Sequence, residues 1–192
     1  MLSTVIYLKE HVPAVQHLPV LLRSAIQHEW HLNVFDAVNG ANLPWKFRVD
    51  QRYPKVIKTM ERPGVRGCFA SHYELWTKAL TTGQTMAIFE HDILFVKPPP
   101  TDLGKADIIK LDGFRVSKPA PTGQWWEGAH AYIIKPQGAK KLIEWVGRWG
   151  ASPADFMLGD KVADIAFDLA QRVQLVDLGS TTWNLPMSDE LT

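Results

Sequence analysis

Two carboxylates separated by one residue, Glu90 and Asp92, follow an apolar segment in the run TMAIFEHD (85–92). The run is short and continuously apolar before its acids, as is typical of a strand buried on both faces. Because side chains alternate along a strand, Glu90 and Asp92 point the same way and His91 points the other way. Two such carboxylates suit a hard divalent cation that keeps open positions for substrate phosphates. Taken alone, however, this triplet favours an ordinary strand end that enters a turn.

Alternating strand and helix patterns predict where this acidic pair lies. Short apolar runs bounded by turn residues are typical of strands covered on both faces, and helical patterns separate them. The sequence therefore predicts an α/β domain with a mostly parallel central sheet flanked by helices. Ligands of open parallel sheets bind beyond the carboxyl ends of the strands. The predicted strands are 3–8, 32–37, 85–92, 106–112, 129–135 and 172–178, and the predicted helices are 13–29, 67–83, 136–150 and 153–171.

Several local features carry further structural expectations. Pro19 interrupts the first helical pattern and is expected at a late N1 position. In the second helix a stripe from Cys68 to Ala79 has helical spacing, and Gly83 is expected just beyond the C-terminal end. Cys68 itself is expected to be a small buried hydrophobe. Residues 38–66 are punctuated by proline and glycine, which predicts a long surface excursion of the kind that is often functional.

Composition and charge narrow the class of protein. The 192 residues are 46% hydrophobic and 21% charged, which predicts one soluble globular domain over 1–192. The formal net charge of +1 argues against nonspecific electrostatic binding to nucleic acid or to an anionic membrane. The single cysteine, the lack of a signal-peptide h-region and the lack of any apolar stretch of about 20 residues predict a cytoplasmic protein without stable membrane insertion.

The run 64–95, GVRGCFASHYELWTKALTTGQTMAIFEHDILF, resembles the central signature of glycosyltransferase family 25, the lipopolysaccharide and collagen-type glycosyltransferases. That signature is a Gly-x-x-Gly-Cys-x-x-Ser-His segment, a Leu-Trp helix and a hydrophobic strand that ends in Glu-Asp-Asp. Similar flanking elements agree in order and spacing over residues 32–160. They are FDAVNG (35–40), GAHAYIIKPQGAKKLIE (128–144) and PADFML (153–158).

Two positions depart from the family pattern. His91 replaces the middle acid of the triplet, although the first and last positions usually coordinate the metal in glycosyltransferases of this class. The family also tends to carry an arginine soon after its first strand, whereas this chain has Lys9 there and no arginine before Arg23.

The resemblance implies a GT-A fold and transfer of a sugar from a nucleotide-diphosphate donor, a UDP-sugar above all, to a hydroxyl of a glycan acceptor. It implies that Glu90 and Asp92 hold Mn²⁺ or Mg²⁺ on the diphosphate and that Asp155 is the base of an inverting reaction. The implied catalytic residues are Asp155 and Asp92. The implied donor-binding residues are Gly64, Gly67, Ser71, His72, Glu90 and Asp112, and the implied acceptor-binding residues are Trp125, Trp126 and Glu127.

These residues also have ordinary structural interpretations. His72 could be a buried histidine satisfied by a neighbour, Asp155 a first-turn helix acid and Asp112 a surface strand end. Trp125 and Trp126 could pack their loop down instead of stacking on a sugar.

Two further functions stay open at this level. One is a catalytically silent relative that binds a glycan or a nucleotide, which His91 and the missing early arginine motivate. The other is transfer to a modified base in DNA, for which the basic and aromatic segment 45–58, with Arg48, Arg52 and Lys55, would provide contacts.

Overall fold

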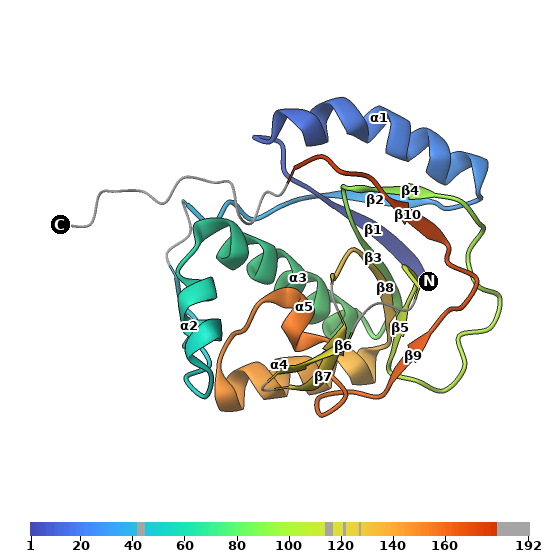
Figure 1. Cartoon of the computed structure of the whole chain (residues 1–192). Helices are drawn as coiled ribbons and strands as arrows, with labels where there is room; N and C mark the ends of the chain where they lie inside the picture. Colours follow the sequence, from blue (N-terminus) through green and yellow to red (C-terminus); the bar gives the residue numbers. More distant parts are fainter. Residues whose placement is uncertain (42–44, 114–116, 121, 127, 180–192) are drawn as a thin grey trace.

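A mostly parallel sheet runs through the molecule, as predicted. The computed structural model describes residues 1–41, 45–113, 117–120, 122–126 and 128–179, except the side chains of Ser117 and Trp125. Its central strands are β1 (Leu2–Tyr7), β2 (Leu32–Asp36), β3 (Met86–Glu90), β5 (Ile108–Lys110), β8 (Ala131–Ile134) and β9 (Ile165–Phe167). They lie in the order β2-β1-β3-β8-β5-β9 (Figure 1). Adjacent strands are parallel except that β8 runs against both β3 and β5.

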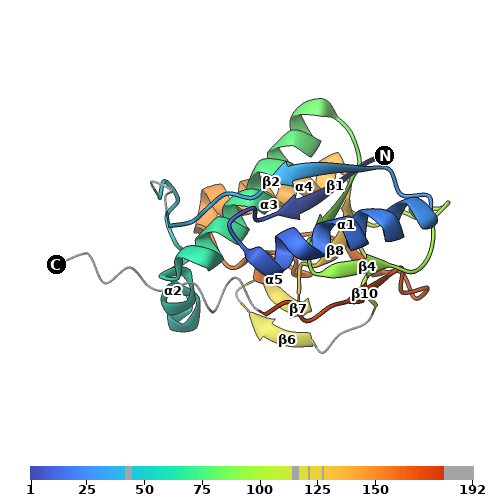
Figure 2. The same ribbon diagram turned by 90° about the horizontal axis from the view of Figure 1, so that it is seen from above.

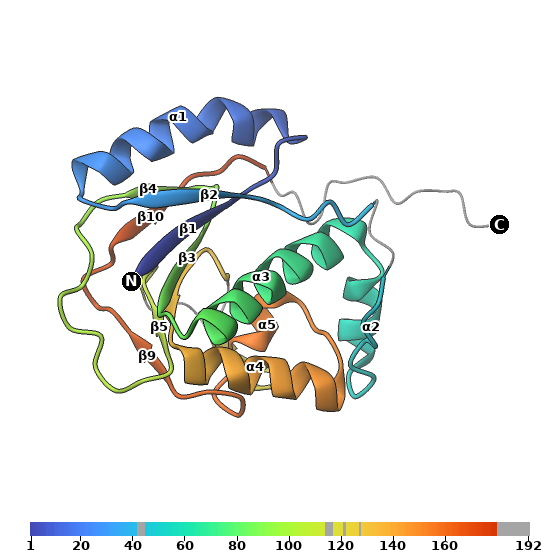
Figure 3. The same ribbon diagram turned by 180° about the vertical axis from the view of Figure 1, so that it is seen from behind.

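Helices and two small ribbons flank this sheet. The helices are α1 (Val12–Gln27), α2 (Pro54–Met60), α3 (Pro63–Thr82), α4 (Pro136–Trp149) and α5 (Ala154–Met157). The ribbon strands are β4 (Ile93–Phe95), β6 (Ser117–Ala120), β7 (Gly123–Trp126) and β10 (Val173–Leu175). α1 and the β4–β10 ribbon cover one face (Figures 1 and 2), and α3, α4 and α5 cover the other (Figure 3). None of the helices in the described part of the chain is both long enough and apolar enough to cross a lipid bilayer.

Alternate residues of the central strands face two separate cores. In β3, Met86 and Ile88 pack with α3 and α4, whereas Ala87 and Phe89 pack with α1. All four are fully buried, which explains why the strand is continuously apolar. The next position in the first series is Glu90, so the alternation directs Glu90 to the α3 side of the sheet.

The start of α3 is joined to the loop after β2 through two glycines. A Cβ on Gly67 would lie 2.4 Å from the Val38 carbonyl oxygen, and one on Gly40 would lie 1.7 Å from the Pro63 carbonyl oxygen. No side chain fits at either position, so the loop lies directly on the helix. α3 begins at Pro63, earlier than predicted, and ends as predicted at Gly83, whose φ of 66° is left-handed.

Pro19 does not begin a helix, contrary to the prediction. α1 runs unbroken from Val12, with Pro13 in its first turn and Pro19 inside it. Pro19 cannot donate a hydrogen bond to the Val15 carbonyl. Both residues lie on the exposed side of α1, so water can reach that carbonyl and the helix continues.

The predicted helix over 153–171 is wrong beyond its first turn, because the chain leaves α5 and then forms β9. A Cβ on Gly159 would lie 2.4 Å from the Thr122 carbonyl oxygen, and Asp160 Oδ1 accepts a hydrogen bond from the Gln124 backbone N–H at 2.9 Å. These long-range contacts tie the segment to the β6–β7 hairpin and override its helical pattern.

The described part of the segment 38–66 carries regular structure. It contains α2 and the start of α3, and Val49 forms a parallel bridge with Ala151. Arg52 anchors it: Nε donates to Asp50 Oδ1 at 2.9 Å, and Nη2 donates to Oδ2 at 2.5 Å. The guanidinium also lies 4.2 Å from the ring centre of Trp149, and the Asp50 side chain is fully buried.

We expect Arg52→Lys to lower the free energy of unfolding by about 1–2 kcal/mol, since lysine keeps the charge but loses the bidentate geometry and the ring stacking. Urea denaturation measures this loss. Arg23→Lys is the matched control, because Arg23 is exposed on α1. Equal stability of the two variants would contradict the structural role of Arg52.

Candidate functional site

Glu90, Asp92 and His130 converge beyond the carboxyl end of β3. The Glu90 backbone N–H donates to the His130 carbonyl at 2.8 Å, so the pairing of β3 with the start of β8 places these residues side by side. His130 Nδ1 lies 3.3 Å from Glu90 Oε2 and 3.1 Å from Asp92 Oδ2. The three side chains are 20–25% exposed. We call this group the acidic cluster.

Hydrogen bonds and neighbouring charges together outweigh burial in setting the pKa values of the acidic cluster. Burial alone would lower the pKa of His130, but hydrogen bonds to Asp92 and Glu90 outweigh it and raise this pKa to about 10. Burial would likewise raise the pKa of Glu90, but hydrogen bonds from His130 and His72 hold it well below its usual range. Without a metal the imidazolium form of His130 is therefore favoured at neutral pH, and a cation that binds Nδ1 would displace this proton.

The donor set of the acidic cluster fits a divalent cation. One imidazole nitrogen and two carboxylate oxygens lie within 4.8 Å of one another. Carboxylates suit Mg²⁺ and Mn²⁺ alike, whereas an imidazole nitrogen in the set favours a transition-metal ion such as Mn²⁺. His91 does not join this set; its ring centre lies 5.7 Å from that of His11.

Two side chains of α3 contact Glu90 from the core side of the acidic cluster. His72 is fully buried, and its Nε2 lies 3.1 Å from Glu90 Oε1. Cys68 Sγ donates to the same oxygen at 3.6 Å. Burial and the Glu90 charge raise the pKa of the Cys68 thiol well above its usual value, so the thiol is unreactive, although the residue is half-buried rather than fully buried as expected. His72 is thus both a satisfied buried histidine and a direct partner of the acidic cluster.

Asp155 lies in the first turn of α5, near the acidic cluster. Burial and the charge of Glu90 raise its pKa to about 6, against the weaker opposing effects of the Phe156 backbone N–H and the Lys110 charge. The Phe156 N–H donates to Asp155 Oδ1 at 3.0 Å. A partly exposed carboxylate with this pKa is suited to accept a proton near neutral pH.

A cleft opens beside Glu90 between the sheet edge and the start of α3. Gly64 and Ser71 both line it, whereas Gly67 supports it by contact with the loop. Ser71 Oγ accepts from the Val38 N–H and donates to the Gly67 carbonyl, each at 2.8 Å. The lining residues are Ile6, Leu8, Ala37, Val38, Asn39, Gly40, Gly64, Cys68, Ser71, Glu90 and His91. We call it the sheet-edge cleft.

The remaining predicted site residues are less directly placed. The Asp112 carboxylate is buried 3.5 Å from Lys110 Nζ, at the carboxyl end of β5. The Trp126 ring packs edge-on against Phe167 with centres 4.9 Å apart. The side chain of Trp125 and all of Glu127 lie outside the described residues.

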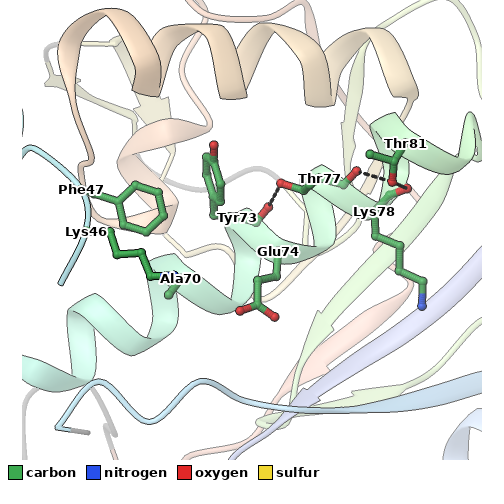
Figure 4. A pocket seen from close by; sticks show the side chains of 8 residues that line it. All are labelled: Lys46, Phe47, Ala70, Tyr73, Glu74, Thr77, Lys78 and Thr81. Carbon is green, nitrogen blue, oxygen red and sulfur yellow. Dashed lines mark hydrogen bonds between the residues drawn. The ribbon is translucent and has the colours of Figure 1, made fainter. Parts of the chain in front are cut away.

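A separate groove of about 500 Å³ lies on another side of α3 (Figure 4). No residue of the acidic cluster lines this groove. The figure shows the groove residues spread along α3 and the neighbouring loop at residues 46–47, without converging on one point. Its lining residues are Lys46, Phe47, Ala70, Tyr73, Glu74, Thr77, Lys78 and Thr81.

Sequence reasoning missed His130 as a member of the site. The signal was present, because His130 lies two residues before Tyr132 and strand periodicity puts both on one face. Tyr132 pairs with Ile88 in β3, which places His130 opposite Glu90. What the sequence did not contain was the antiparallel pairing of β8 with β3.

Two cations of the segment considered for DNA contacts are engaged within the protein. Arg48 Nη2 donates to the Arg148 carbonyl at 2.5 Å, and Arg52 is held by Asp50 and Trp149. Nothing in the described part of the chain favours a DNA acceptor over a glycan.

Comparison with solved structures identifies the fold. Galactosyltransferase LgtC, crystallised with donor and acceptor sugar analogs, aligns with 87% of this chain and 73% of its own at 13% identity and a TM-score of 0.50. The catalytic domain of Drosophila beta1,4-galactosyltransferase 7 in complex with xylobiose aligns with 92% of this chain and 70% of its own at 10% identity and a TM-score of 0.47. With the sheet order above, the first likeness shows the predicted GT-A fold.

Comparison with protein families confirms the resemblance seen in the sequence. No curated protein matches the chain. The model of glycosyltransferase family 25 (LPS biosynthesis protein) matches residues 16–99, which include α3, the sheet-edge cleft residues from Ala37 to His91, and Asp92. His130 and Asp155 lie beyond the matched part. Residues 16–99 therefore match glycosyltransferase family 25, and this match supports a transferase.

Proposed function

We propose that this chain transfers a sugar from a nucleotide-diphosphate donor to a hydroxyl of a glycan acceptor, with inversion at the anomeric carbon. The observation that carries the proposal is the acidic cluster, which combines two carboxylates and an imidazole at the carboxyl edge of the sheet, beside the sheet-edge cleft. Ligands of open parallel sheets bind at this edge. A UDP-sugar is the first donor to test, and the family description suggests a lipopolysaccharide-type acceptor. The single cysteine motivates a cytoplasmic location.

Glu90, Asp92 and His130 would hold Mn²⁺, or less favourably Mg²⁺, on the donor diphosphate. The cation supplies charge that stabilises the leaving diphosphate. Gly64 and Ser71 shape the sheet-edge cleft for the donor, and His91 lies at its wall. Because glycine has no side chain, a ligand in the cleft can approach the backbone closely at Gly64.

Asp155 would act as the base. It accepts the proton of the acceptor hydroxyl while that oxygen attacks the anomeric carbon from the side opposite the diphosphate. The bond from oxygen to carbon forms as the bond to the diphosphate breaks, so a single displacement inverts the configuration. We propose supporting roles for Trp126 at the acceptor side and for Asp112 at the donor side.

A thermal-shift screen of nucleotide sugars tests the proposal. At a ligand concentration of about 100 times Kd, the donor should stabilise the fold by about 2.7 kcal/mol. For a domain of this size that corresponds to a rise in Tm of roughly 5–10 °C. The rise should require Mn²⁺ and disappear with EDTA, and the matching nucleoside monophosphate is the control that lacks the diphosphate. If no donor shifts Tm with or without Mn²⁺, the catalytically silent alternative is favoured instead.

A further inference from the structure

Beneath the acidic cluster, three fully buried polar side chains form a connected chain that ends on Glu90. Trp76 Nε1 lies 2.7 Å from Tyr132 Oη, and Tyr132 Oη lies 2.8 Å from His72 Nδ1. His72 Nε2 in turn lies 3.1 Å from Glu90 Oε1. Trp76, Tyr132 and His72 are each 0% exposed.

The elements that carry these residues explain their alignment. His72 and Trp76 are four residues apart and share one face of α3. Tyr132 pairs with Ile88, and Glu90 lies two residues further along β3 on the same face. A helix stripe thus meets one face of two adjacent strands, and the contact is polar where the rest of that core is apolar.

The chemistry of the three groups sets the direction of the hydrogen bonds. An indole N–H can only donate, so Tyr132 Oη accepts from Trp76. Among the described residues the Tyr132 hydroxyl has no acceptor for its own proton other than His72 Nδ1. His72 must then carry its proton on Nε2, where it donates to Glu90. In the opposite tautomer the Nε2 lone pair would face a carboxylate oxygen, and the Tyr132 proton would be left without an acceptor.

We propose that Trp76, Tyr132 and His72 form a one-directional hydrogen-bond relay that positions Glu90 for its role in the acidic cluster. The relay holds Oε1 toward α3, with Cys68 as a weaker second donor, so that Oε2 faces His130 and Asp92. These are positioning residues, and the proposal rests on the proposed function for the role of Glu90. Oε2 is then the Glu90 atom available to a cation, with Oε1 already occupied.

The tautomer of His72 tests the relay directly in the free protein. Two-bond ¹⁵N–¹H correlation spectra distinguish the two neutral tautomers, and His72→Gln assigns the signal by its disappearance. We expect the Nε2–H tautomer in the wild-type protein. An Nδ1–H tautomer would overturn the relay, whether or not the protein transfers sugar, so this result is separable from the fate of the proposed function.

Tyr132→Phe removes one hydroxyl and keeps the ring, and Tyr73→Phe is the matched control because Tyr73 lines the groove of Figure 4 instead. In Tyr132→Phe we expect the Nε2–H preference to weaken and the Kd for Mn²⁺, measured by electron paramagnetic resonance without donor, to rise about 10–100-fold, as for other residues that orient metal ligands. Tyr73→Phe should change neither. An unchanged tautomer together with an unchanged Mn²⁺ affinity in Tyr132→Phe would overturn the positioning role.

Discussion

Asp155→Asn is expected to reduce kcat/KM for sugar transfer by about 10²–10⁴-fold, the usual contribution of a general base. The same variant should be more stable than the wild-type protein at pH 7. Asparagine keeps an oxygen that can accept from the Phe156 N–H, but it removes a charge that burial and Glu90 disfavour. Initial rates and denaturant unfolding on the same samples measure both effects. A residue that served folding alone would not combine lost activity with gained stability.

The stability cost of Asp155 and its contribution to activity should both change with pH around its pKa. The pKa of Asp155 is raised in the folded protein from 3.8 to about 6, so the folded state binds this proton more tightly than the unfolded state. Ionisation of Asp155 therefore costs stability as pH rises from about 4 to about 6, on the order of 1–3 kcal/mol in total. The stability gained in Asp155→Asn should be absent below about pH 4 and constant above about pH 6. Activity runs the other way in the wild-type enzyme, rising with pH through about 6 as the base loses its proton.

Asp164→Asn is the matched control for these measurements. Asp164 is exposed just before β9, at the opposite edge of the sheet from the acidic cluster. We expect it to leave both rate and stability close to those of the wild-type protein. If Asp155→Asn transferred sugar at a wild-type rate, Asp155 would not be the base, and a search among the other carboxylates of the site would have to follow.

The parts of the fold that could be predicted are those set by local patterns. A continuously apolar run such as β3 is buried on both faces whatever it pairs with, and the glycine after α3 marks a helix end through its own φ. The helix predicted for the segment after α5 is wrong because long-range contacts override the local pattern. Its helical spacing is real, but Gly159 and Asp160 are used by Thr122 and Gln124 of the distant β6–β7 hairpin.

The candidate site likewise contains residues whose positions follow from local patterns and residues whose positions depend on long-range strand pairing. The side-chain alternation in β3 predicts that Glu90 leaves the core on the α3 side, and the structure places it there beside His72. Asp92 lies beyond the strand, so strand alternation alone does not determine its position. It reaches Glu90 through His130, which the pairing of β8 with β3 brings to their common edge. Such a pairing is a long-range property, and a single sequence does not specify it.

Asp92→Asn should cause the largest loss of metal binding of any single change in the acidic cluster. Asp92 contacts His130 through both of its carboxylate oxygens, at 3.2 and 3.1 Å, and its side chain is 25% exposed, so it is open to a cation. Asparagine is nearly the same shape but carries no charge, and a divalent ion held by one fewer anionic oxygen loses several kcal/mol of attraction. We expect the Kd for Mn²⁺ to rise by about 10²–10⁴-fold and the Mn²⁺-dependent rate to fall in parallel, at about 1.4 kcal/mol for each factor of ten.

His91→Asn is the variant that makes this result decisive, because His91 occupies the position between the two acids. Its ring lies beside His11 and outside the acidic cluster, so we expect the Kd for Mn²⁺ in His91→Asn to stay within about threefold of the wild-type value, as for a residue that is not a ligand. Calorimetric titration with Mn²⁺ in the absence of donor compares the three proteins without reference to activity. If His91→Asn lost Mn²⁺ binding as fully as Asp92→Asn, the ligands would not be Glu90, Asp92 and His130. If neither variant differed from the wild type, the cation would bind elsewhere. Weak binding in Asp92→Asn alone would mean that replacing the middle acid by histidine leaves the metal site intact, since the outer two positions belong to the acidic cluster and the middle one lies beside His11.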